Sequence, residues 1–405
     1  MRMGWAVSLM VCCSRGGLRV PLGRTMGSGR FDSADNVHRN IGNLSSAAIA
    51  LRSLMKRLPC LAAALACLGA AAFAQTASNR DIYIYSGADR DKRLVEGAKK
   101  EGQVLFYSTM TVADGKALAT AFEQKYGVRV NHWRGSAEKI VSRAIAEARA
   151  RRHEADLFET SSHRVEALYR ERLLEDFHTP VLRDIVPEAF PRGHRQYVAD
   201  RFAFFVMGYN TKLVKREELP AAYEDLLQPR WTGKITIEGT DVLWFAAVAK
   251  AMGEDKGIAY FRKLAAMKPE IRHGHIHTAQ LVASGEVAFF LTAYNNNIET
   301  LKQKGAPVEW KALQPAFGQA AAIGLSRYAP HPHAALLFTE FVLSKEGQEI
   351  LKAGNRVPTS RLVDSPLNKF KYEIVDPELA LDEGDKWDRL FSSLFLGGRA
   401  VKEGD

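Results

Sequence analysis

Short hydrophobic runs alternate with amphipathic segments from Gly102 onwards. Val104–Tyr107 has the length and composition of a buried strand, and the hydrophobic residues between Leu118 and Tyr126 repeat with the spacing of one helix face. Later segments repeat this order. The pattern predicts strands at 104–107, 128–133, 156–160, 201–209, 234–238, 287–291 and 320–325. Helices are expected between them, including one that Ser136 caps and one that begins after His331.

Strand–helix alternation of this kind predicts an α/β fold with a parallel sheet covered on both faces. About 330 residues are more than one hydrophobic core usually takes, so we expect two lobes. No flexible linker separates them, which indicates that the chain crosses between lobes more than once. We expect lobe 1 at 102–204, lobe 2 at 205–317, a return to lobe 1 at 318–360, an N-terminal segment at 75–101 and a C-terminal helical segment at 361–405.

Residues 55–74 have the pattern of a cleaved secretory signal peptide. Lys56 and Arg57 form the positive start, an uncharged hydrophobic run follows, and Ala72-Phe73-Ala74 fits the cleavage site of signal peptidase. The alternative is a buried core helix. We therefore predict an exported protein that begins at Gln75.

Residues 1–54 show little periodicity and read as a mis-assigned or disordered N-terminal extension. All four cysteines lie at or before position 67, so the exported part is predicted to contain no disulfide and no cysteine-bound metal. Cys67 follows a poor lipobox, and a lipid anchor there is the alternative to cleavage before Gln75.

The net charge of the chain is +10, but residues 1–74 carry +7 of it, which leaves +3 for the rest. This balance gives no indication of a nucleic-acid partner. No hydrophobic run after residue 74 has the length of a membrane span.

Five loops that follow predicted strands carry small hydroxyl residues or glycine next to a predicted helix start. Ligands of open parallel sheets lie at this edge, where free N–H groups favour an anion or a polar group. Each loop alone could be an ordinary helix cap. Together they predict a binding cleft lined by Ser108, Thr109, Thr111, Ser136, Ser161, Ser162, Thr240, Asp241, Tyr294 and Asn295. Trp244 and Phe245 are candidates for an apolar wall or for core packing.

The sequence contains no phosphate loop, no GxGxxG, no GxSxG and no HExxH motif. One metal-like cluster is His273, His275 and His277, which would share a face in an extended segment. The alternative is a solvent-facing strand or loop before a helix at Thr278. No catalytic group of residues is apparent, and no resident cofactor is expected.

Two groups of motifs resemble bacterial periplasmic solute-binding proteins. Tyr209–Val214, Tyr223–Leu227 and Trp231–Ile235 are similar to the entry into their second lobe. Ala329–Phe338 and Leu343–Gln348 are similar to their closing helix pair. The resemblance covers residues 102–360 and is strongest to the iron(III)-type binding proteins of ABC importers.

This resemblance implies a two-lobed type II periplasmic binding protein fold with a hinge near Tyr209 and Tyr294. It also implies a periplasmic location and a membrane permease and ATPase as partners; we expect a monomer. The resemblance further implies ferric iron as a possible transported ligand. Ferric binders of that family have a His, a Glu and a Tyr-Tyr pair where this chain has Thr111, Ser161 and Asn296-Asn297.

Hard Fe³⁺ requires anionic oxygen ligands, which hydroxyls and amides replace poorly. We therefore expect a small oxygen-rich anion, or iron already chelated by one, to bind better than bare Fe³⁺. Two other classes of function are open: a secreted hydrolase or lyase that uses Asp241 with His163, and an extracellular interaction module.

Overall fold

The computed structural model describes residues 78–401, all of which belong to one compact unit of the chain. The predicted extension, the signal peptide and the four cysteines lie outside these residues. None of the helices in the described part combines the length and hydrophobicity that a bilayer crossing needs.

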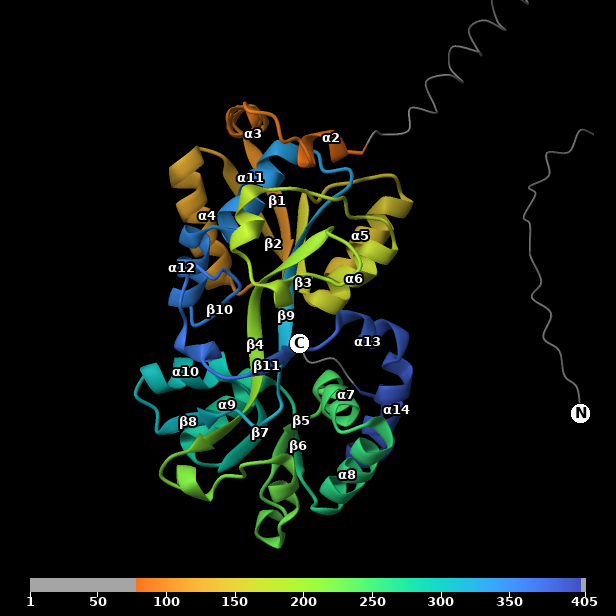
Figure 1. Cartoon of the computed structure of the whole chain (residues 1–405), viewed down its shortest axis with the longest axis vertical. Helices are drawn as coiled ribbons and strands as arrows, with labels where there is room; N and C mark the ends of the chain where they lie inside the picture. The colour runs from red at the N-terminus through yellow and green to blue at the C-terminus, as the bar shows by residue number, and fades with distance from the viewer. Residues whose placement is uncertain (1–77, 402–405) are drawn as a thin grey trace, which may run out of the picture. The chain divides into compact units, whose positions relative to one another are not determined.

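The strands occur where the hydrophobic runs predict them, with further short strands added (Figure 1). They are β1 Gln103–Ser108, β2 Arg129–Arg134, β3 Leu157–Ser161, β4 Tyr197–Asn210, β5 Thr236–Glu238, β6 Glu270–Arg272, β7 Phe289–Tyr294, β8 Val308–Lys311, β9 Ala316–Leu325, β10 Val357–Pro358 and β11 Tyr372–Ile374.

The helices follow the amphipathic segments. They are α2 Arg80–Tyr83, α3 Arg90–Glu101, α4 Val112–Tyr126, α5 Ala137–Arg149, α6 Ser162–Arg170, α7 Val242–Ala251, α8 Glu254–Ala266, α9 His275–Ser284, α10 Asn295–Gln303, α11 Pro332–Leu343, α12 Lys345–Ala353, α13 Pro377–Asp382 and α14 Gly384–Phe395. Ser136 caps α5 as predicted, because its side chain accepts a hydrogen bond from Lys139 N.

The sheet is mixed, and the prediction of a parallel sheet is wrong for its centre. Its strand order is β2-β1-β3-β9-β4-β7-β5-β6. The outer neighbours β2-β1-β3 and β7-β5-β6 are parallel, whereas β9 and β4 run antiparallel to their neighbours in this order. Lobe 1 is built on β1–β3 and lobe 2 on β5–β8, so β4 and β9 are the strands that connect them.

The change of lobe occurs within β4. Its first half, to Phe204, pairs with β9, and from Phe205 onwards it pairs with β7. Tyr294 is the partner of Phe205 at this change, whereas Tyr209 lies four residues further into lobe 2. Alternate side chains of β4 also enter different hydrophobic cores, because Phe204 and Val206 pack in one and Phe205 and Met207 in another.

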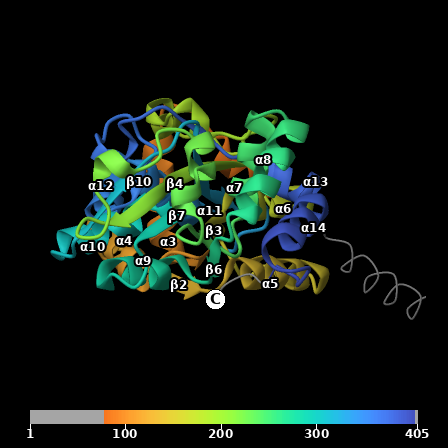
Figure 2. The ribbon, with the colours of Figure 1, turned by 90° about the horizontal axis from the view of Figure 1, so that it is seen from below.

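The C-terminal helices lie on one side of the waist between the lobes. Figure 1 shows α13 below α6 of lobe 1, and α14 beside α7 and α8 of lobe 2, at the right-hand edge of the view. Figure 2, seen from below, again places α14 near α13 and α7. This arrangement makes the C-terminal segment a third wall of the space between the lobes.

Candidate functional site

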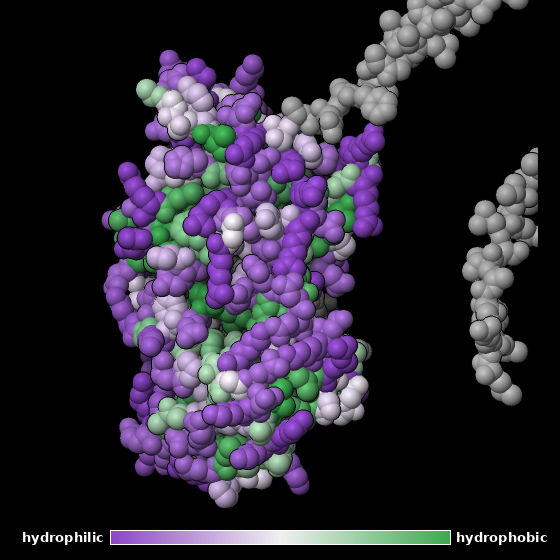
Figure 3. Space-filling model, turned by 45° about the vertical axis from the view of Figure 1, so that its right-hand side comes forward, coloured by the Kyte–Doolittle hydropathy of each residue, from purple (hydrophilic) through white to green (hydrophobic). Residues whose placement is uncertain are grey.

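A cavity of about 550 Å³ lies between lobe 1, lobe 2 and the C-terminal helices. Most of its walls are the first turns of helices, as expected for the carboxyl edge of parallel strands. Figure 3 shows a recess at mid-height of this side, with hydrophobic residues inside a mostly hydrophilic surface. Lobe 1 contributes Ser136, Ala137, Glu138, Ser161, His163 and Arg164, and lobe 2 contributes Thr240, Asp241, Val242, Leu243, His275 and Tyr294.

Five of the predicted site residues line this cavity: Ser136, Ser161, Thr240, Asp241 and Tyr294. They come from four separate segments of the sequence and from both lobes. Their common position supports the sequence-based choice of loops, while their contact with a solute stays a prediction.

The structure does not place the other five at the cavity. Ser108 is fully buried and donates its hydroxyl hydrogen to Glu159 at 2.6 Å. Thr111 caps α4 by accepting a hydrogen bond from Asp114 N. Thr109 and Ser162 are not part of the lining either, and Asn295 is buried, where its amide donates to Leu367 O. The side-chain polar groups of Ser108, Thr111 and Asn295 are thus used by the protein itself.

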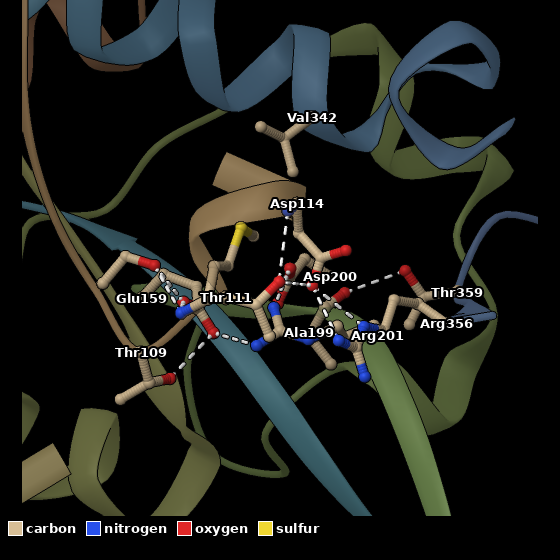
Figure 4. A network of polar contacts seen from close by, with 12 residues as sticks. Thr109, Thr111, Asp114, Glu159, Ala199, Asp200, Arg201, Val342, Arg356 and Thr359 are labelled. Atoms are coloured by element: carbon tan, nitrogen blue, oxygen red, sulfur yellow. Dashed lines mark hydrogen bonds and ion pairs between the residues drawn. The ribbon is translucent and has the colours of Figure 1, made fainter. Parts of the chain in front are cut away.

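Glu159 explains why the loop after β1 is closed off (Figure 4). This buried carboxylate accepts hydrogen bonds from the Ser108 hydroxyl at 2.6 Å and from Met110 N at 3.2 Å, and it pairs with Arg201 at 2.9 Å. A buried charge is stabilised only when it is paired and hydrogen-bonded, so the loop is fixed to it.

An irregularity in β4 brings a second carboxylate into this network. The β4–β9 register shifts between Ala199 and Arg201, so Asp200 is the extra residue of a β-bulge. Arg201 therefore pairs with its own neighbour, Asp200, at 2.7 Å and also with Glu159. Burial raises the pKa of Asp200 to about 7, with Arg201 opposing and Glu159 adding to the effect.

On the lobe 2 side, an imidazole, a carboxylate and a phenol form one group. His275 lies 3.2 Å from the Asp241 carboxylate and stacks on Tyr294 with ring centroids 3.9 Å apart. Burial disfavours a charge on His275, but Asp241 and Glu238 outweigh it and raise the pKa of the imidazole. Gln319 donates to the Tyr294 hydroxyl at 2.8 Å, which fixes the phenol at the cavity.

The three-histidine segment is divided by the start of a helix. His275 begins α9 and lines the cavity, whereas the His273 side chain is 58% exposed and His277 is also exposed. The helix therefore begins three residues before the predicted Thr278. In the residues that the structure describes, no group of three or more His, Cys, Asp or Glu side chains could hold a metal ion.

Several lining residues were missed as site candidates. Arg164, Glu138 and the C-terminal Trp387 and Asp388 face the cavity. Arg164 and Glu138 each lie within three residues of a chosen serine, so the first turn of each helix was the available signal. No local pattern indicated that residues 379–388 return to the cleft. Trp244 and Phe245 are buried in the lobe 2 core, not in the cavity wall.

Two lobes joined by β4 and β9, with a cavity between them, define the fold of two-lobed periplasmic binding proteins. A family model described as bacterial extracellular solute-binding protein matches residues 155–377, which is more than half of the chain. The chain belongs to this family. It therefore serves as the periplasmic solute-binding component of an ABC transporter, and its family consists of transport proteins.

The names of similar proteins mention different solutes. The chain is 24% identical to iron uptake protein A1 of Synechocystis sp. over 302 residues, which is 70% of this chain and 82% of the relative. Iron-bound HitA of Pseudomonas aeruginosa is 25% identical with a TM-score of 0.63, over 72% of this chain and 99% of HitA. AfuA of Actinobacillus pleuropneumoniae, with fructose-6-phosphate bound, is also 25% identical. Its TM-score is 0.61, over 73% of this chain and 99% of AfuA.

Proposed function

We propose that this cleft captures a small organic anion, such as a phosphorylated or carboxylated solute, and passes it to its permease. The observation that carries the proposal is the start of α6. Its N-cap, Ser161, makes no side-chain capping bond, and the first turn opens into the cavity with Arg164 beside it. Unused N–H groups and a guanidinium at one wall are a binding site for an anion.

The α6 start differs from helices that are closed by their own side chains. Thr111 caps α4 and Ser136 caps α5, whereas Ser161 caps nothing. In lobe 2, Asp241 precedes α7 without capping it, because its carboxylate is directed to His275. A solute oxygen at the start of α6 would thus replace the missing cap.

Bare Fe³⁺ fits the cavity less well. Burial, together with Asp241 and Glu238, raises the pKa of Tyr294 well above its ordinary value. The phenol is therefore neutral in the ligand-free protein and would have to release its proton to supply the anionic oxygen that Fe³⁺ needs. The Asp241 carboxylate is already paired with His275. A cavity of about 550 Å³ is also within the range for a small organic molecule.

A ferric ion carried by an organic chelator is the second candidate. The chelator would present its carboxylates to the start of α6 in the same way as a free anion. The iron-bound HitA structure and the sugar-phosphate-bound AfuA structure favour neither chemistry, since both are 25% identical to this chain.

The alternative of a hydrolase would use Asp241 with His163. Asp241 instead pairs with His275, and burial with Arg164 lowers the pKa of His163 to about 4.

We further propose that the exported protein begins at Gln75 and acts as a monomer. N-terminal sequencing of protein from the native host tests the start; retention of residues 1–54 or a lipid on Cys67 would contradict it.

A thermal-shift screen tests the solute. Sugar phosphates, phosphonates, dicarboxylates, citrate, ferric citrate and ferric chloride are added to the protein and to Arg164→Gln. A cognate anion raises the melting temperature because it binds only the folded state, and Arg164→Gln reduces the shift. A tight chelator-free Fe³⁺ complex with tyrosinate charge-transfer absorption, lost in Tyr294→Phe, would show that the proposal is wrong.

A further inference from the structure

The C-terminal helix pair is attached to the two lobes by different kinds of contact. On lobe 2, α14 is fixed by its apolar face. Trp387 and Phe391 are buried, and each ring centroid lies 5.6 Å from that of Phe245 in α7. Separating these rings would expose hydrophobic surface to water, so α14 moves with lobe 2.

The attachment to lobe 1 includes two ion pairs at exposed positions. Arg170, at the end of α6, bonds to both carboxylate oxygens of Asp382 at the end of α13. Arg192, in the loop before β4, lies 3.2 Å from Asp376 at the start of α13. Arg170 and Asp382 are 39% and 52% exposed, so water can replace each partner when the pair opens.

The connecting strand β9 and the C-terminal helices form different walls of the cavity. Gln319 of β9 lines one wall, and Leu379, Leu381 and Asp388 of the C-terminal helices line another. Any rotation of the lobes about β4 and β9 changes the distance between α6 and a helix pair that moves with lobe 2. Because they lie at exposed positions, the two ion pairs can separate and re-form without exposing a core.

We propose that Arg170–Asp382 and Arg192–Asp376 form an ionic latch that holds the lobes at their closed spacing. The latch sets the fraction of closed protein before any solute binds. Exposed ion pairs are screened by salt, so high ionic strength shifts the ligand-free protein toward the open spacing. This inference concerns the lobes alone and holds whichever solute the cleft takes.

Distance measurement between spin labels tests the latch without a solute. The described residues contain no cysteine, so Lys139→Cys on α5 and Lys256→Cys on α8, both exposed, give one label in each lobe. We expect the interlobe distance of the ligand-free protein to lengthen between 50 mM and 1 M NaCl. The double variant Arg170→Gln/Arg192→Gln should have the longer distance already at 50 mM and lose the salt response.

Two further variants keep the result interpretable. Lys386→Gln removes an ion pair between α14 and Glu254, 2.6 Å apart, within the lobe 2 attachment, and should leave the distance and its salt response unchanged. In protein that keeps Arg192, the exchanged pair Arg170→Asp/Asp382→Arg should have an interlobe distance close to the short one of the original protein. An unchanged distance in the double glutamine variant, or no recovery in the exchanged pair, would show that the latch does not exist.

Discussion

The loops after β1 and after β3 contain the same kinds of residue but have different fates. Ser108 ends β1 and is followed by Thr109 and Thr111, while Ser161 ends β3 and is followed by Ser162. The first loop is held by Glu159 and caps its own helix, whereas the second leaves the start of α6 open at the cavity. Hydroxyls at a helix start therefore indicate a binding site only when no buried group of the protein uses them.

The largest expected effect of this difference is on stability, at Glu159. Glu159→Ala leaves the partly buried Arg201 with only Asp200 and releases the loop after β1, so we expect a loss of about 3–5 kcal/mol in unfolding free energy. Urea denaturation measures it. Glu171→Ala, an exposed carboxylate at the end of α6, is the control and should cost less than about 0.5 kcal/mol. Equal effects would show that the Glu159 network does not hold the loop.

The next effect is on solute affinity, at Arg164. Arg164→Gln removes the guanidinium beside the open start of α6, and we expect the solute found by thermal shift to bind about 10–100-fold more weakly. Arg134→Gln is the matched control, because Arg134 contacts Met110 O on the closed side and does not line the cavity. Isothermal titration should find its affinity within about two-fold of the original protein. A similar loss of affinity in both variants would contradict the role of Arg164 in binding the solute.

A pair of serine substitutions tests the two loops directly. Ser108→Ala removes a buried hydrogen bond to a charged group and should cost about 1.5–3 kcal/mol of stability, with little effect on affinity. Ser161→Ala should change stability by less than about 0.5 kcal/mol and weaken the binding of the solute a few-fold. Denaturation and titration of both variants give four values, and the reversed pattern would disprove the comparison.

The last effect appears only as a pH dependence of stability, at Asp200. Its pKa rises from the ordinary 3.8 to about 7 on folding, so the folded state binds more protons than the unfolded state between these values. The contribution of Asp200 to stability therefore decreases as pH rises from about 4 to 7. Melting temperatures of Asp200→Asn should decline less over this range than those of the original protein. Parallel curves would show that Asp200 does not titrate there.

Local patterns predicted the elements of this fold well, and for a physical reason. Runs such as Val104–Tyr107 and caps such as Ser136 are decided by neighbours within a few residues. The antiparallel placement of β9 between β3 and β4 depends on contacts between distant segments, and no local pattern contains them. The fold class nevertheless followed from the order of the motifs.

The site was predictable only in part for the same reason. Ser161 and Tyr294 are the last residues of strands whose carboxyl ends reach the cavity, so a rule about strand ends found them. Whether Ser108 is available depends on Glu159, 51 residues away, and whether Asp388 reaches the cleft depends on the path of the C-terminal segment. Those facts require three-dimensional contacts.

The position of β9 also determines the order in which the chain can fold. In lobe 1, β9 lies between β3 and β4, yet it begins 155 residues after β3 ends. As the chain emerges from its N-terminus, β1, β2 and β3 appear first but lack the strand that joins them to β4. Contacts between such distant segments form slowly. For a member of an extracellular family, this topology delays completion of the first lobe until most of the chain has appeared.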